Sequence, residues 1–176
     1  LRQLQRVPIY LDGRDPASNA RMQRLFTQLA GGQDAARTRL RLLGRSVNAL
    51  GCRADVVWFD FATLCEGTRS QNDYLELTQE FRTVLLSDVP MFDAPECDDA
   101  ARRFIALVDA LYDHGTKLVV SAATAPEQLY RGQRLQQDFQ RTASRLIEMQ
   151  TADYLARPRR DAEDLPAEHF DDKMTP

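Results

Sequence analysis

The chain has 176 residues, of which 43% are hydrophobic, and its 23 basic and 26 acidic side chains give a formal net charge of −3. This is enough apolar material for one domain with a buried core, and the acidic balance argues against a nucleic-acid partner, because phosphate-binding surfaces are normally basic. The three cysteines and two histidines do not have the spacing of metal ligands, so we expect reduced thiols and no metal centre. No apolar run approaches the ~20 residues of a membrane helix, so we expect a cytoplasmic protein without stable membrane insertion.

The first segment, Leu1–Gly13, is predicted to be an extended lead-in, because Pro8 and Gly13 interrupt any helical pattern. A helix should begin at Asp15-Pro16, since aspartate caps helices and proline suits the first helical position. Its expected buried stripe is Met22, Leu25, Phe26 and Leu29, and Gly31-Gly32 should end it. We treat residues 1–37, the lead-in and this helix, as the first unit of the chain.

Alternating apolar and polar residues follow in a second unit, residues 38–158. The alternation in Arg39–Leu42 and again in Ser46–Leu50, with Gly44 between them, predicts a small antiparallel β-hairpin. A third, largely apolar strand is expected over Asp55–Phe61. A short helix should then run through Phe81, capped by Asn72 or Ser70.

The segment Thr83–Ser121 has the pattern strand, helix, strand. Thr83–Leu86 and Leu118–Val120 are short apolar runs typical of buried strands. The helix between them should begin at Asp98-Asp99, where acids favour the helix dipole, and end at Gly115. This order predicts a parallel α/β sheet with flanking helices.

The last part of the second unit is expected to be helical. Thr124-x-x-Glu127 predicts a capping box for a short helix that ends at Gly132. Phe139–Leu155 then has the pattern of a single amphipathic helix. Its expected apolar face is formed by Leu135, Phe139, Thr142, Leu146 and Met149. Residues 159–176 are polar and are predicted to form a C-terminal tail, which Leu165 and Phe170 could anchor.

Two arginines, Arg141 and Arg145, lie one turn apart on this predicted helix. Asp138 precedes the first by three residues and Glu148 follows the second by three, so both arginines could belong to an ion-paired helix surface. Alternatively, two stacked guanidinium groups could bind an anion. Spacing alone leaves both interpretations open.

The motifs of common active sites are missing from this sequence. No glycine begins the pattern G-x-x-x-x-G-K-[ST] that cradles nucleotide phosphates, and no G-x-S-x-G elbow occurs. The predicted strands that end at Asp88 and Ser121 imitate a Walker B strand followed by a polar sensor strand. Because Val89-Pro90 follows Asp88 where active enzymes have a catalytic glutamate, we interpret Asp88 as a turn residue at a strand end.

Several blocks of the sequence resemble, in order, the C-terminal half of the ZapE-type (AFG-like) P-loop ATPases and their mitochondrial relatives. The most specific block is F-x-R-T-x-S-R-L-x-E-M-Q, followed by Tyr154-Leu155. The other blocks are Arg2–Leu11, Trp58–Cys65, Asp73–Leu75, Thr83–Pro90, Arg102–Tyr112, Lys117–Ala122 and Leu129-Tyr130. Together they extend over nearly the whole chain.

The resemblance implies that this chain is the C-terminal α/β portion of an ATPase that couples ATP hydrolysis to bacterial cell division. The intact protein would use ATP and Mg²⁺, and the chain alone would be inactive and bind no cofactor because it lacks the P-loop. Arg141 and Arg145 are the expected catalytic residues and Arg103 and Arg102 the expected nucleotide-binding residues, because arginines beyond the P-loop complete such sites.

The expected partners follow from the same resemblance. They are the N-terminal half that carries the P-loop, further copies of the protein in a homo-oligomer, and the tubulin-like protein of the division ring. A function of another class also fits the sequence, namely a stand-alone protein-interaction module with no nucleotide role.

Overall fold

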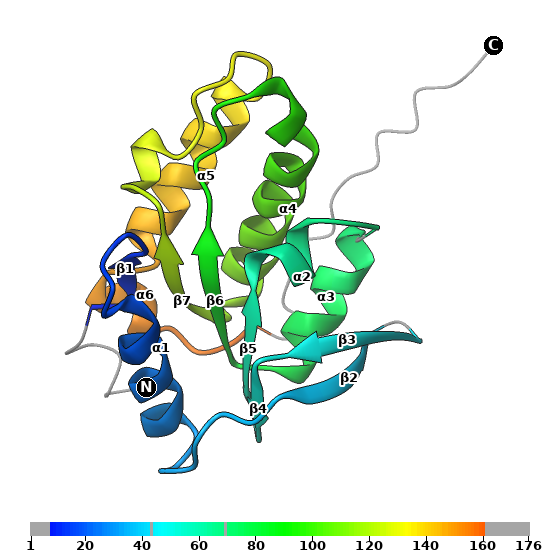
Figure 1. Ribbon diagram of the computed structural model, residues 1–176, viewed down its shortest axis with the longest axis vertical. Coiled ribbons are helices and arrows are strands. Elements are labelled where there is room, and N and C mark those ends of the chain that lie inside the picture. Colours follow the sequence, from blue (N-terminus) through cyan, green and yellow to red (C-terminus); the bar gives the residue numbers. More distant parts are fainter. Residues whose placement is uncertain (1–7, 43, 69, 161–176) are drawn as a thin grey trace.

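The computed structural model describes residues 8–42, 44–68 and 70–160. Its centre is a five-stranded sheet in the order β1-β7-β6-β5-β4, parallel except for β4, which pairs antiparallel with β5 (Figure 1). The strands are β1 Tyr10–Asp12, β4 Gly51–Arg53, β5 Val56–Asp60, β6 Thr83–Val89 and β7 Lys117–Ala122. The predicted α/β fold is confirmed, whereas the expected anchors Leu165 and Phe170 lie outside the described residues.

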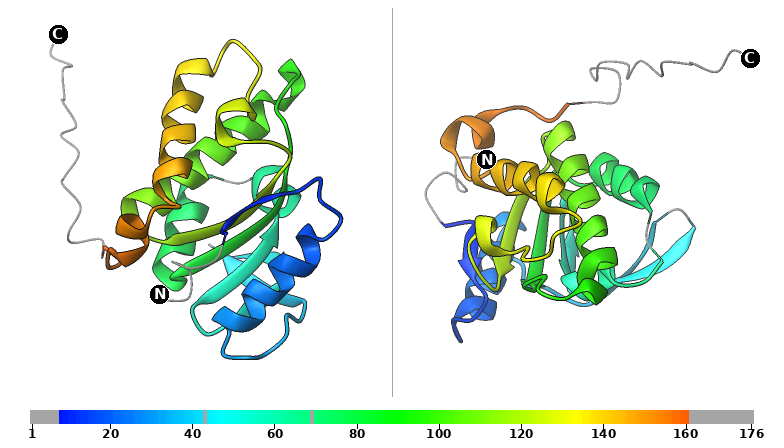
Figure 2. Two further views of the ribbon diagram at one scale, coloured as in Figure 1. Left: turned by 90° about the vertical axis from the view of Figure 1, so that its left-hand side faces the viewer. Right: turned by 90° about the horizontal axis from the view of Figure 1, so that it is seen from above.

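The central strands are buried because helices cover both faces of the sheet (Figure 2). Helix α1, Ser18–Leu29, packs on one face against β5, β6 and β7. Helix α4, Asp98–His114, lies on the opposite face, with α3, Gln71–Glu80, and α5, Gln136–Glu148, packed beside it. Burial on both faces explains why the strands are continuous apolar runs without alternation.

The expected lead-in contributes the edge strand β1, and just before it the Ile9 carbonyl accepts a hydrogen bond of 2.8 Å from the Val120 amide of β7. Helix α1 begins at Ser18, later than expected, because Asp15 forms a separate turn. Its carboxylate accepts from the Ala17 amide at 2.9 Å, and its carbonyl accepts from the Ser18 amide. Of the predicted stripe, Met22, Leu25 and Phe26 are buried and Leu29 is half-buried.

The predicted hairpin is confirmed as a separate two-stranded antiparallel sheet of β2, Thr38–Leu42, and β3, Arg45–Ala49. Arg45 attaches it to the body by donating to the Thr68 carbonyl at 2.6 Å and by an ion pair of 3.4 Å with the buried Asp73. The hairpin also packs against β5 and α3.

The helix caps show how local sequence sets element boundaries. Asp60 caps α2, Phe61–Cys65, through the Thr63 amide, and Ser70, rather than Asn72, caps α3 in a capping box with Asp73. Helix α4 ends as predicted at Gly115, which has the left-handed φ of 68°. A glycine is favoured there because other residues adopt this conformation with strain.

Two predictions for the C-terminal helices are wrong. The Thr124-x-x-Glu127 pattern forms no capping box, because the Thr124 hydroxyl bonds the Gln128 side chain at 3.1 Å instead; the segment is the 3-10 turn η3, Pro126–Gln128, similar in kind to η2, Pro95–Cys97. The expected single helix over 139–155 is two helices, α5 and α6, Ala152–Ala156. The Thr151 hydroxyl ends one by donating to the Glu148 carbonyl and caps the other by accepting from the Tyr154 amide.

The core on the α4 face centres on four phenylalanines from different elements. Ring centroids lie 5.7 Å apart for Phe61 and Phe92, 5.9 Å for Phe92 and Phe104, and 5.8 Å for Phe92 and Phe139. Such tilted pairs add to the burial of apolar area. The cluster joins α2, the segment after β6, α4 and α5, and so fixes the position of the helix that carries the two arginines.

Candidate functional site

The two arginines of α5 turn toward α4 and share one carboxylate. Arg145 hydrogen-bonds and ion-pairs with Asp109, has a second, longer contact of 3.8 Å with Asp113, and stacks its guanidinium 4.8 Å from the Tyr112 ring centroid. Arg141 reaches the other oxygen of Asp109 at 3.4 Å. The shared carboxylate therefore offsets the repulsion between two cations one turn apart.

The two arginines differ in exposure. The Arg145 side chain is 23% exposed, whereas that of Arg141 is 53% exposed and has the longer contact with Asp109. Arg145 is thus a packed, ion-paired residue, and Arg141 presents its guanidinium to solvent. An incoming anion would meet Arg141 first.

Asp138 and Glu148, the acids that the spacing suggested as partners within the same helix, do not form the ion pairs of these arginines. Their ion pairs are formed with α4, and Glu148 instead accepts a 2.7 Å hydrogen bond from the Tyr112 hydroxyl and pairs with Arg157 at 3.1 Å. The Tyr112 hydrogen bond lowers the pKa of the Glu148 carboxyl, and the same bond raises the pKa of Tyr112. A charge network therefore continues from α4 through α5 to the segment after α6.

Lys117, at the amino end of β7, is a buried cation on the same side of the sheet. Only 2% of the residue is exposed, and its ammonium donates to the carbonyls of Tyr154 and Arg157 at 2.8 and 3.0 Å. The ammonium also lies 4.4 Å from the Tyr154 ring centroid. Burial, and secondarily Arg157, lower the pKa of Lys117 to about 8. Its role here is to fasten α6 to the sheet.

The second predicted pair, Arg102 and Arg103, lies in the first half of α4. Arg103 donates to the Cys65 carbonyl at 3.3 Å and lines a cavity of about 260 Å³ with residues of α2 and of the segment after β6. Arg102 is exposed. Six residues of helix, or ~9 Å along the axis, separate Arg103 from Asp109. The four arginines therefore do not form one cluster in the described structure.

Asp88 and Ser121, which the sequence placed at two strand ends, do meet. The Asp88 amide donates to the Ser121 hydroxyl at 3.0 Å, and Asp88 has a left-handed φ of 65° where the β6–β7 register shifts. They border a cavity of about 220 Å³ whose other wall is the loop between β1 and α1. The sequence predicts only an extended lead-in for this segment. The alternation of Ile9 and Leu11 before Asp12-Gly13 is the signal that indicates a strand here.

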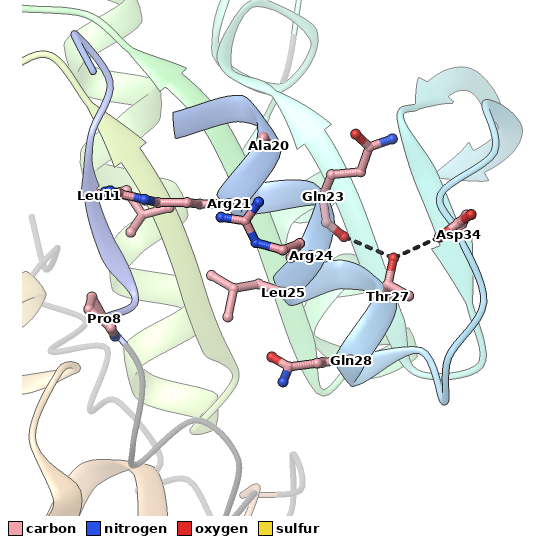
Figure 3. Close-up of a pocket in the computed structure, with 10 residues that line it drawn as sticks. All are labelled: Pro8, Leu11, Ala20, Arg21, Gln23, Arg24, Leu25, Thr27, Gln28 and Asp34. Atoms are coloured by element: carbon pink, nitrogen blue, oxygen red, sulfur yellow. Dashed lines mark hydrogen bonds between the residues drawn. The ribbon is translucent and has the colours of Figure 1, made fainter. Parts of the chain in front are cut away.

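A groove of about 1000 Å³ runs along α1 beside the edge strand β1 (Figure 3). Leu25 and Leu11 lie at its floor, and Arg21 and Arg24 project along it. The Thr27 hydroxyl, at its border, lies 3.0 Å from the Gln23 carbonyl oxygen and 3.1 Å from an Asp34 carboxylate oxygen, so these two acceptors share its one proton. No motif in the sequence marks this surface.

Within the described residues, no group of three or more histidine, cysteine or acidic side chains is arranged to hold a metal ion. No described helix is both long and apolar enough to span a bilayer. Burial raises the pKa of the Cys65 thiol to about 12, so this cysteine is not a nucleophile at neutral pH.

Comparison with known proteins gives a consistent result. Residues 1–158 match the model of the AFG1-like ATPase family. The chain is 40% identical to Cell division protein ZapE of Escherichia coli K12, over 89% of this chain and 42% of the relative, with the same values for the O157:H7 strain. It is 32% identical to Lactation elevated protein 1 homolog B of Danio rerio, over 82% of this chain and 35% of the relative. The chain spans less than half the length of these relatives, and no solved structure matches it.

Proposed function

Because this chain belongs to the AFG1-like ATPase family, we propose that it is the C-terminal portion of a ZapE-type ATPase and supplies arginines that complete the nucleotide site of the intact protein. The P-loop motif is absent from its sequence, so the phosphate-binding loop has to come from the part of the relatives that it does not cover. The isolated chain should therefore not hydrolyse ATP.

Arg141 is the residue that best fits this role, and its exposed guanidinium is the observation that carries the proposal. An arginine that meets charge developing on the γ-phosphate has to leave its resting partner during the reaction. Arg141 has one long contact with Asp109 and is more than half exposed, whereas Arg145 occupies the same carboxylate more closely. Arg145 thus holds Asp109 in place while Arg141 remains available.

Arg103 and Arg102 rank second as nucleotide-binding residues. Arg103 already donates to a backbone carbonyl beside a small cavity, while Arg102 is free to turn to a neighbouring part of the protein. Their position in the first half of α4 separates them from Arg141. If they bind nucleotide, they contact a different part of it or the nucleotide of another subunit.

The test is steady-state ATP hydrolysis with Mg²⁺ by the intact protein. Arg141→Ala should lower kcat by ~10³ with ATP affinity unchanged, because the lost contact exists only in the transition state. Arg141→Lys should recover little, because the planar guanidinium fork is lost. Arg53→Ala, an exposed arginine on β4, is the matched control. Turnover of Arg141→Ala equal to that of the control would contradict the proposal.

The bacterial relatives are cell division proteins, which supports a role of the intact protein in cell division. In this proposal the intact protein is a cytoplasmic bacterial ATPase that acts on the tubulin-like protein of the division ring, as a homo-oligomer. Co-sedimentation of the intact protein with polymers of that ring protein, with and without ATP, tests the partner. Equal sedimentation in the presence and absence of the polymer would argue against it.

A second candidate function, a protein-interaction module without a nucleotide role, is favoured by the groove along α1. This groove has the exposed Arg21 and Arg24 beside the largely buried Leu25, and within the described residues it lies next to the edge strand β1, where peptides can bind by adding a strand. Under this alternative, Arg24→Glu in the intact protein abolishes partner binding, and Arg141→Ala changes neither binding nor ATP turnover.

A further inference from the structure

We propose that the cavity between the β1–α1 loop and the ends of β6 and β7 binds a phosphate group. Its walls are formed by Gly13–Pro16, Ser18, Asn19, Ser87, Asp88 and Ser121. None of the four candidate arginines, Arg102, Arg103, Arg141 and Arg145, lines this cavity. It is a site in addition to the proposed nucleotide site, and its argument does not depend on that proposal.

The topology of the sheet places this cavity where ligands of open α/β sheets commonly bind. From β1 the chain leads to α1 on one face of the sheet, whereas from β6 it leads to α4 on the other face (Figure 2). A crevice forms outside the carboxyl ends of strands whose connections diverge in this way. The cavity lies in that crevice, between β1 and the β6–β7 pair.

Three serine hydroxyls line the cavity with protons to donate. Ser18 is 5% exposed, and no described residue hydrogen-bonds its hydroxyl. Ser87 and Ser121 are also buried, and each accepts a bond, from the Trp58 indole at 2.7 Å and from the Asp88 amide at 3.0 Å. Since a hydroxyl also donates one proton, these contacts leave a donor on each. A ligand that accepts hydrogen bonds therefore fits, because it would satisfy all three.

The amino end of α1 adds positive potential to the same wall. This helix has 12 residues, its cap residue Ala17 provides no side-chain cap, and its first turn contains no acid. The Asp15 carboxylate, just before it, is already engaged by the Ala17 amide and by Arg21 at 3.2 Å. Because the Ala17 and Ser18 amides already donate to Asp15, this end offers an anion the helix dipole and the remaining amides of the first turn.

The size and charge of the cavity define the ligand further. About 220 Å³ is less than the 300–1,000 Å³ typical of sites that enclose drug-sized molecules, so the cavity accommodates a phosphate group and not the nucleoside attached to it. Arg14, held by Asp12 at 3.1 Å, lies at the rim, and the exposed Asp88 carboxylate opposes an anion. The Asp15 carboxylate also lines the cavity, although it is paired with Arg21. Because an anion would therefore meet two carboxylates, we expect weak binding, in the millimolar range.

The experiment is a titration of the ¹⁵N-labelled full chain with inorganic phosphate in chloride buffer, followed by amide chemical shifts. Saturable shifts should concentrate in the β1–α1 loop, at Ser87-Asp88 and at Ser121. Ser18→Ala should weaken binding about tenfold, which is the expected loss of one hydrogen bond to a charged group, without lowering Tm. Ser144→Ala, on the exposed surface of α5, is the control and should bind like the wild type. Unsaturable shifts, or equal affinity of the Ser18→Ala and Ser144→Ala variants, would overturn the proposal.

Two further arms define the chemistry. Asp88→Asn should tighten phosphate binding ~3-fold by removing one opposing charge; weaker binding would mean that the carboxylate holds a cation, and the oxyanion proposal would fail. The phosphate could be free or carried by a larger molecule. Tighter binding of phosphoserine than of inorganic phosphate supports a carried group, and the reverse supports the free ion.

Discussion

Arg141 and Arg145 illustrate how one turn of helix separates two roles. Both contact Asp109, but Arg145 also approaches Asp113 and stacks on Tyr112, while Arg141 remains more than half exposed. A partly buried cation with two kinds of partner contributes to stability, whereas an exposed ion pair contributes little. The chain thus keeps one arginine for packing and leaves its neighbour available.

The stability of single-arginine variants tests this division. Arg145→Ala should lower the free energy of unfolding by ~1–2 kcal/mol, since it removes the pairing and stacking of a partly buried side chain. Arg141→Ala should cost less than ~0.5 kcal/mol. Urea denaturation of the chain measures both. A cost for Arg141→Ala as large as that for Arg145→Ala would show that the two residues are equivalent.

Lys117 gives the protein a predictable pH dependence. Its pKa is lowered from 10.5 to about 8 in the folded chain, so between those values the unfolded chain binds more protons. Stability therefore rises with pH across this window, and the penalty for burying the charged form is fully present below it. Relative to Lys117→Met, the wild type should gain unfolding free energy from pH 8 toward pH 10. The raised pKa of the Cys65 thiol lowers stability with pH in both proteins and so cancels in this difference. Parallel pH profiles would contradict this assignment.

At the scale of elements, the turn between α4 and β7 depends on a glycine for two reasons. Gly115 has a left-handed φ of 68°, and a Cβ there would lie 3.0 Å from the Pro158 carbonyl oxygen. Gly31, after α1, has a similar φ of 72° but open space around it. Comparing substitutions at Gly31 and Gly115 therefore distinguishes the cost of backbone strain from the cost of a clash with the segment at Pro158.

Alanine substitutions at these two glycines make the separation measurable. Gly31→Ala should cost ~1 kcal/mol from the left-handed conformation alone. Gly115→Ala should cost at least ~1 kcal/mol more, because the segment at Pro158 has to shift. Thermal unfolding of both variants provides the comparison. Equal losses would mean that the contact with Pro158 contributes nothing.

Local sequence predicted some elements well because their signals are local. Burial on both faces gave β5, β6 and β7 continuous apolar runs, and Gly115 marked the end of α4. The strand β1 was not recognised, since a three-residue edge strand is defined by its pairing with β7, more than a hundred residues away in sequence. The break at Thr151 was missed because the apolar stripe continues through Met149.

The candidate site was predicted less completely for the same physical reason. Periodicity places Arg141 and Arg145 on one helical face, but it can indicate only partners in the same helix, namely Asp138 and Glu148. Their carboxylate partner, Asp109, belongs to another helix. Likewise, the contact between Asp88 and Ser121 follows from the strand order. The wall of their cavity that the β1–α1 loop forms could not be predicted without the position of β1.

At the scale of the whole molecule, the described residues form a five-stranded sheet with helices on both faces, and the chain corresponds to less than half the length of its bacterial relatives. Its sequence lacks the phosphate-binding loop, while α5 carries an exposed arginine above a shared carboxylate. These features fit a portion that completes a site built mainly elsewhere. In the proposed function, the part of the relatives that this chain does not cover supplies the phosphate-binding loop, and this chain supplies the arginine.

The most direct test is the ratio of kcat values for ATP hydrolysis by the Arg141→Ala and Arg53→Ala variants of the intact protein, at saturating ATP and Mg²⁺. A ratio near ~10⁻³, with both variants folded and equal in ATP affinity, is the predicted result. A ratio near one would remove Arg141 from the catalytic site and leave the surfaces of this portion, above all the groove along α1, as the place of its function.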